Sequence, residues 1–216
     1  MSEPFDKDFE GQAIRTIYRK MKKTAKARFN AAKRLERQQD FLAWSTALFS
    51  IGLIVLALFS AFEIPIVISD KLNSLLQVVL ALVLLVASVL LSGKSFDRRA
   101  SSMHSCGLEI QGLCNSILDE CSKDTPSPAV TSKANEKYAT ILSAYDNHAK
   151  IDNDMVEADM KTEYGVGAMR ACWIRIRYAL CFWIYIVLLL VFVAVVALTL
   201  GLVPNLPDWM MRPTNT

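Results

Sequence analysis

The chain has 216 residues, of which 53% are hydrophobic, and it also carries 24 lysines and arginines and 21 aspartates and glutamates. This mixture is typical of a membrane anchor with a substantial aqueous part, and it argues against a fully buried polytopic transporter. The net charge is only +3, so the distribution of the charges is more informative than their sum.

The first segment, residues 1–41, is predicted to form a basic cytoplasmic helix. Ten lysines and arginines fall between Arg15 and Arg37, against a single acid. Neither glycine nor proline occurs at positions 12–51, so one helix should run from this segment into the apolar residues that follow. Such a charge could bind nucleic acid or anionic lipid. We expect it to set the topology and to pair with the acidic residues of segment 146–163, and we do not expect direct nucleic-acid binding, because no base-reading motif accompanies it.

Two uncharged apolar runs follow, at residues 42–62 and 72–92, and each has 21 residues. About 20 apolar residues cross the hydrocarbon core of a bilayer as a helix. Pro65 is expected to end the first run, and Ser69 or Asp70 to cap the second. The sequence therefore predicts a transmembrane hairpin over residues 42–92.

The second run contains polar side chains near one helical face, among them Asn73, Gln77 and Ser88. A side-chain amide in hydrocarbon needs a hydrogen-bond partner or water. Two interpretations stay open. Either these residues cross-link helices within one chain, or several copies assemble with this face lining a central pore, since three spans cannot enclose a channel alone.

Residues 93–177 are predicted to form a cytoplasmic helical segment, into which the second span continues. Its apolar residues follow the spacing of a heptad seam, which indicates a helix-bundle core: Phe96, Ala100, Met103, Gly107, Ile110, Cys114, Ile117 and Cys121. Pro126 and Pro128 interrupt the helix in a polar linker at residues 122–133. The same spacing then predicts a further helix through Ala134, Tyr138, Ile141, Tyr145 and His148.

A third apolar run at residues 178–203 is long enough to span a membrane and leaves an external tail at 204–216. Basic residues gather before the first run and in segment 93–177, whereas the hairpin connection and the tail carry one each. Because basic residues stay cytoplasmic, we expect the N-terminus inside and the C-terminus outside.

No catalytic motif is recognisable, and the chain is not expected to be an enzyme. The five cysteines and two histidines do not have the spacing of a zinc site. We therefore expect neither a metal nor a cofactor, and no disulfide on the inner side of the membrane. The predicted class is an all-α membrane protein, a transmembrane helical hairpin with a third C-terminal span and long helices that extend into a cytoplasmic helical bundle.

Three segments around the hairpin resemble a known family. They are residues 26–37 (KARFNAAKRLER), 98–112 (RRASSMHSCGLEIQG) and 138–152 (YATILSAYDNHAKID). Their order resembles the SLATT domain, the SMODS- and SLOG-associating two-transmembrane effector proteins of bacteria, over residues 12–155, and within it the branch linked to reverse-transcriptase systems. The third run departs from the two-span pattern.

This resemblance implies a multi-pass protein of the bacterial inner membrane that acts in anti-phage defence. Such an effector is silent until a cytoplasmic sensor protein or a nucleotide signal triggers it, and it then oligomerises and permeabilises the lipid bilayer. The alternative is a non-conducting membrane scaffold that recruits a cytoplasmic partner. Polar residues that we expect to hold the inhibitory bundle are Arg28, Asn30, Arg34, Arg99, His104, Glu109 and His148.

Overall fold

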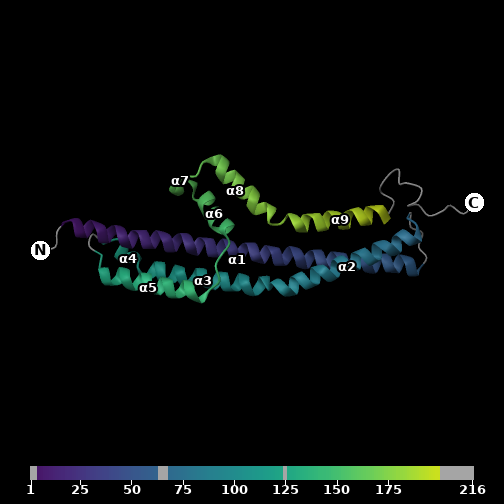
Figure 1. Cartoon of the computed structure of the whole chain (residues 1–216), viewed down its shortest axis with the longest axis horizontal. Coiled ribbons are helices and arrows are strands. Elements are labelled where there is room, and N and C mark those ends of the chain that lie inside the picture. Colours follow the sequence, from purple (N-terminus) through teal and green to yellow (C-terminus); the bar gives the residue numbers. More distant parts are fainter. Residues whose placement is uncertain (1–3, 63–67, 124–125, 200–216) are drawn as a thin grey trace, which may run out of the picture. The chain divides into compact units, whose positions relative to one another are not determined.

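The described residues form helices as their regular secondary structure, which confirms the predicted all-α class. The computed structural model describes residues 4–62, 68–123 and 126–199 (Figure 1). The long helices are α1 (Pro4–Ala61), α2 (Asp70–Lys94), α3 (Phe96–Ser116), α5 (Pro128–Ala144), α8 (Ala168–Leu180) and α9 (Trp183–Thr199). The shorter helices are α4 (Leu118–Cys121), α6 (Lys150–Asp159) and α7 (Lys161–Tyr164).

The chain folds as two compact units that share helix α1. The bundle unit comprises Met1–Glu36 and Phe96–Leu180, and the hairpin unit comprises Arg37–Ser95 and Cys181–Thr216. The sequence-based boundaries lie a few residues away, after positions 41, 92 and 177. Helix α1 runs without a break from the bundle unit into the hairpin unit, as the absence of glycine and proline predicts.

The core of the bundle unit is formed where α1, α3 and α5 meet. The predicted seam is buried along α3 and on to Ile117, the residue after its end, and it packs with Ile14 and Met21 of α1 and Tyr138 of α5. At Gly107 the backbone of α3 comes so close to α1 that an added Cβ would lie 2.8 Å from the Phe29 ring. A small residue in the seam thus permits a close helix approach. A second cluster joins α6 and α8 through Ala158, Val166, Ala171 and Ile174.

Two helix ends differ from the prediction. The second span does not continue as one helix, because Ser95 adopts a left-handed conformation (φ 43°) between α2 and α3. Helix α5 begins at Pro128, a residue favoured in the first helical turn, and ends at Ala144. Tyr145 is extended, so the expectation that Tyr145 and His148 lie on this helix is wrong. Tyr145 still packs against the bundle core, although it lies in the connection that leads to α6.

The hairpin unit has a narrow core and an apolar exterior. Phe49 and Leu56 of α1 pack against Leu80 of α2, and the Phe192 ring of α9 joins this cluster. A Cβ at Gly52 would collide with the same ring. Many other large apolar side chains of α1 and α2 in this unit are exposed, among them Ile51, Leu58, Leu75, Val78 and Leu82. Such surfaces suit a lipid environment.

Two helices of the described residues are long and apolar enough to cross a membrane. The first is the apolar part of α1, which ends at Ala61, and the second is Asp70–Leu90 in α2. Ser69 occupies the N-cap position of α2, in agreement with the sequence. The predicted third run begins instead with the last residues of α8, and a turn at Cys181 and Phe182 precedes α9. Its crossing of the membrane stays a prediction, and the tail at 204–216 lies outside the described residues.

Candidate functional site in the bundle unit

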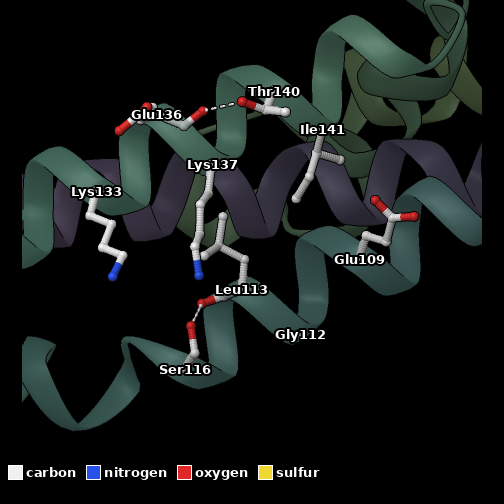
Figure 2. A pocket seen from close by; sticks show the side chains of 9 residues that line it. All are labelled: Glu109, Gly112, Leu113, Ser116, Lys133, Glu136, Lys137, Thr140 and Ile141. Carbon is white, nitrogen blue, oxygen red and sulfur yellow. Dashed lines mark hydrogen bonds between the residues drawn. The ribbon is translucent and has the colours of Figure 1, made fainter.

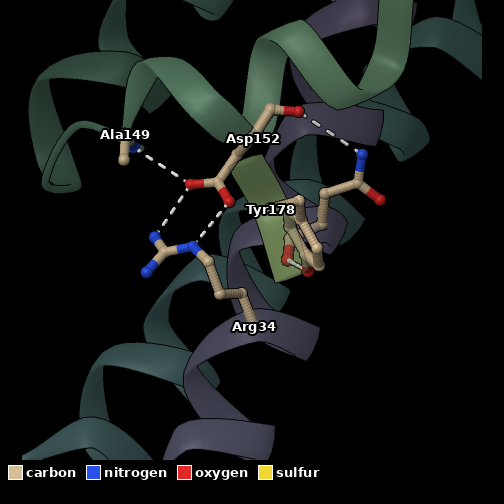
Figure 3. A network of polar contacts seen from close by, with 5 residues as sticks. Arg34, Ala149, Asp152 and Tyr178 are labelled. Atoms are coloured by element: carbon tan, nitrogen blue, oxygen red, sulfur yellow. Dashed lines mark hydrogen bonds and ion pairs between the residues drawn. The ribbon is translucent and has the colours of Figure 1, made fainter. Parts of the chain in front are cut away.

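The bundle unit contains a buried ion pair between α1 and α6. The Nε and Nη2 atoms of Arg34 donate to the two carboxylate oxygens of Asp152, at 2.8 and 2.9 Å (Figure 3). The side chain of Asp152 has no solvent exposure, and that of Arg34 is 13% exposed. Asp152 also accepts a hydrogen bond from the backbone N–H of Ala149, at 3.1 Å. One carboxylate therefore both neutralises Arg34 and caps the first turn of α6.

Asn30 extends this network to α8. Its Nδ2 donates to the backbone carbonyl of Asp152 at 3.4 Å, and its own backbone carbonyl accepts from the Tyr178 hydroxyl at 3.4 Å (Figure 3). Asn30 and Arg34 are one helical turn apart, so they point in the same direction. The Asp152 network, which we define as Asn30, Arg34, Ala149, Asp152 and Tyr178, thus links α1, α6 and α8.

Arg28 lies deeper in the same unit and is fully buried. Its Nη1 donates to the backbone carbonyl of Asp146 and to the sulfur of Met103, the latter at 3.2 Å. Within the described part of the chain, its Nε and Nη2 have no hydrogen-bond partner. A buried guanidinium held by a carbonyl and a thioether lacks the carboxylate that normally offsets its desolvation.

His148 lies in the connection between α5 and α6 and is half-buried. Burial lowers its pKa below the usual 6.5, and the positive charge of Arg28 lowers it further, whereas Asp152 acts in the opposite direction. Its Nδ1 has no hydrogen-bond partner among the described residues. The neutral imidazole is the form that this environment favours.

The other three predicted bundle residues are exposed on α3. The His104 ring meets the Phe29 ring edge-on, with centroids 5.4 Å apart. Glu109 accepts a hydrogen bond from the Tyr145 hydroxyl, which raises the pKa of this tyrosine. Arg99 makes no hydrogen bond or ion pair with the residues that the structure describes. The structure thus brings Asn30 and Arg34 together at Asp152, with Arg28 and His148 nearby, and leaves Arg99 apart.

Basic side chains of α1 pair with acidic side chains of α6, as the sequence predicts. Besides the Arg34–Asp152 pair, Lys23 Nζ lies 2.8 Å from Glu157 Oε1. Both of these side chains are partly exposed, so this second pair contributes little on its own. The buried pair at Asp152 is the stronger determinant of how α6 docks on α1.

A groove of about 640 Å³ lies between α3 and α5 (Figure 2). Leu113 and Ile141 form its apolar part, and Lys133, Lys137 and Glu109 stand around it. No group of three metal-ligating side chains occurs in the described residues.

The predicted polar face of α2 lies partly inside the hairpin. Asn73 is buried, and its Oδ1 has no hydrogen-bond partner among the residues described. The Nε2 of Gln77 donates to the backbone carbonyl of Leu56 on α1, at 3.5 Å. Ser88 is half-buried. In a single chain, Asn73 and Gln77 are thus largely covered by the hairpin itself.

A family model matches residues 11–199, described as "SMODS and SLOG-associating 2TM effector domain family 5". The chain belongs to this family. The SLATT resemblance that the three sequence segments carry is thereby confirmed, and the match extends through α9. SLATT domains are two-transmembrane effector domains associated with defence systems. No curated protein and no solved structure gives a significant match.

The residue at the centre of this SLATT bundle, Asp152, was not singled out by the sequence. It occurs in an acidic segment and looks like one solvated carboxylate among several. Its partner Arg34 is 118 residues away, a separation that no local pattern reveals. The one local signal is its position three residues after Ala149, where an acidic side chain caps a helix start.

Three cysteines of the bundle unit lie in or against its core. Burial raises the pKa of the Cys106, Cys114 and Cys121 thiols above their usual value. A thiol must ionise to react, so these side chains stay protonated at neutral pH. Cys106 and Cys114 of α3 belong to the core cluster, and Cys121 of α4 packs against it.

Proposed function

We propose that this SLATT chain is an anti-phage effector of the bacterial inner membrane, whose bundle unit holds the hairpin in a silent state. The observation that carries the proposal is the continuity of α1. One helix bears the Asp152 network at Asn30 and Arg34, and the same helix bears the apolar segment that ends at Ala61. Because a helix transmits rotation and shift along its length, a change in the bundle would reach the membrane.

In the proposed topology the N-terminus and the bundle unit are cytoplasmic, and the chain ends outside after a third span built from α9. The distribution of basic residues supports this orientation. The packing of Phe192 with Phe49, with ring centroids 5.3 Å apart, supports a span that lies against the hairpin. The apolar exteriors of α1 and α2 face lipid in this arrangement.

The proposed active state is a homo-oligomer in which the face with Asn73, Gln77 and Ser88 lines a pore. In the single chain Asn73 is buried and Gln77 donates to the backbone carbonyl of Leu56 on α1. Buried amides in an apolar hairpin are costly unless they gain partners or water. A trigger that loosens the packing of α1 would let these side chains leave the hairpin interior and line a water-filled pore. The chain carries out no enzymatic reaction in this account.

The test is the membrane potential of phage-challenged bacteria that carry the Gln77→Leu variant. We expect wild-type cells to depolarise and Gln77→Leu cells to keep their potential at equal protein level in the membrane. Val78→Leu is the matched control, because Val78 is 66% exposed on the same helix, and it should depolarise like the wild type. Equal depolarisation by Gln77→Leu and the wild type would refute the proposed pore face.

The groove between α3 and α5 favours a second candidate, a non-conducting scaffold that recruits a cytoplasmic partner. Its volume of about 640 Å³ and its mixed rim of Lys133, Lys137 and Glu109 suit a protein segment. A scaffold leaves the membrane potential unchanged when it is activated, whereas a pore collapses it. The same potential measurement therefore separates the two functions.

A further inference from the structure

Helix α8 presents two apolar faces, of which the bundle covers only one. Ala171 and Ile174 are buried in the cluster with α6, and Tyr178 lies on the same side. The other face is exposed and consists of large apolar side chains, namely Met169 (87%), Trp173 (58%), Ile176 (46%) and Leu180 (54%). At about 100° per residue, these four fall within a strip of about 60°. A continuous apolar strip on a helix of an aqueous unit calls for a partner.

The charges of α8 indicate what this partner is. The helix contains three arginines and no acid. Arg170 and Arg177 lie about 40–60° to one side of Trp173, whereas Arg175 lies about 160° away from it. Arg170 and Arg177 are 67% and 48% exposed. An exposed apolar strip with tryptophan, bordered by arginines, is typical of a helix that lies in the membrane interface.

The position of α8 in the chain points to the same partner. Only Cys181 and Phe182 separate it from α9, a helix of 17 residues without a single charge. We propose that α8 is an interfacial helix. Met169, Trp173, Ile176 and Leu180 enter the boundary between head groups and acyl chains, and Arg170 and Arg177 bind anionic lipid phosphates. This inference rests on the membrane insertion in the proposed function, but not on conduction.

Arg170 and Arg177 also contact acidic residues of α6, so lipid phosphates and α6 would compete for these two side chains. Arg170 Nη2 lies 3.5 Å from Glu157, and Arg177 Nη1 lies 3.8 Å from Asp154. Both distances are longer than the 2.8 Å of a tight charge-assisted hydrogen bond. At Arg170, which is 67% exposed, a phosphate oxygen can therefore replace the carboxylate at modest cost. Anionic lipid that binds α8 weakens the hold of α8 on α6, the helix that carries Asp152.

The test follows Trp173 fluorescence in the full chain, reconstituted into lipid vesicles. The chain has four tryptophans, so Trp44→Phe, Trp183→Phe and Trp209→Phe leave Trp173 as the only one. With phosphatidylcholine containing phosphatidylglycerol, we expect lipids brominated near the head group to quench Trp173. Soluble acrylamide should quench Trp173 less in these anionic vesicles than in vesicles of pure phosphatidylcholine.

The arginine variants test the lipid contact within the same background. Each arginine near an anionic surface shifts the balance between inserted and free helix about fivefold, so Arg170→Gln with Arg177→Gln should shift it about 25-fold and restore acrylamide quenching. Arg175→Gln removes the same charge from the side turned away from Trp173, and it should leave the quenching unchanged.

Two results would overturn the inference. One is acrylamide quenching of Trp173 that is equally strong with and without phosphatidylglycerol. The other is protection that rises with the protein density in the vesicles and not with anionic lipid, because it would assign the strip to a second copy of the chain. Neither readout depends on ion flux, so a chain that does not conduct can still confirm the lipid contact.

Discussion

Replacing Asp152 by asparagine removes the charge at the centre of the bundle while it keeps the size of the side chain. The two Arg34–Asp152 hydrogen bonds, at 2.8 and 2.9 Å, then lose their ionised acceptor. Breaking a buried ion pair costs about 3–5 kcal/mol, because it leaves one charge without compensation. Arg34 is 13% exposed and can reach water, so we expect the lower end, about 3 kcal/mol.

Hydrogen–deuterium exchange of the α6 amides in lipid nanodiscs measures this loss. If α6 undocks about 3 kcal/mol more easily, its amides exchange roughly 100-fold faster. The matched control is Asp159→Asn on the same helix. Asp159 is 49% exposed and lies 3.5 Å from Arg175, so its loss should cost at most about 1 kcal/mol. Equal exchange rates in the Asp152 and Asp159 variants would refute the central role of the buried pair.

A double variant separates the free energy of the ion pair from the effects of changing each side chain alone. Arg34→Gln combined with Asp152→Asn leaves no uncompensated charge, so the double variant should be less destabilised than the sum of the two single variants. The free energies of unfolding of the three variants give this coupling directly. Strict additivity would show that the two side chains act independently.

Two further predictions concern the bundle. Gly107→Ala should lower its free energy of unfolding by about 1–3 kcal/mol, because the new Cβ would lie 2.8 Å from the Phe29 ring. Gly112→Ala on the same helix meets nothing within 4 Å and should stabilise it by about 0.5–1 kcal/mol. Similar melting temperatures for the two variants would contradict this close approach. Burial and the charge of Arg28 lower the pKa of His148 below 6.5 in the folded protein. Its neutral form therefore stabilises the fold above pH 6.5, and this stability is lost as the pH falls through the lower pKa of the folded state. His148→Gln should therefore show a smaller loss of melting temperature than the wild type between about pH 7 and pH 5, and an unchanged pH dependence would refute this role.

Much of the fold follows from the sequence because its signals are local. A long stretch without glycine or proline predicts the continuous α1, and the heptad spacing predicts which side of α3 is buried. The break at Ser95 could not be predicted in this way. A serine rarely adopts the left-handed conformation that ends α2, and the only nearby signal is Gly93, two residues earlier.

The sequence predicts the residues that α1 contributes to the candidate site, but not their partner on α6. Asn30 and Arg34 follow from the motif on α1, but their partner Asp152 lies far along the chain. The heptad spacing also extended too far, to His148, because apolar periodicity does not show where a helix stops. Contacts between distant segments, and not local propensity, decide both features.

Potassium efflux from vesicles that contain the purified chain is the most direct test of the claim that the bundle controls the membrane. We predict that the wild type and Asp159→Asn keep potassium inside, that Asp152→Asn releases it without any trigger, and that adding Gln77→Leu to Asp152→Asn stops the release. Vesicles that remain tight with Asp152→Asn, although hydrogen exchange shows that α6 has undocked, would contradict the coupling between the bundle and the hairpin.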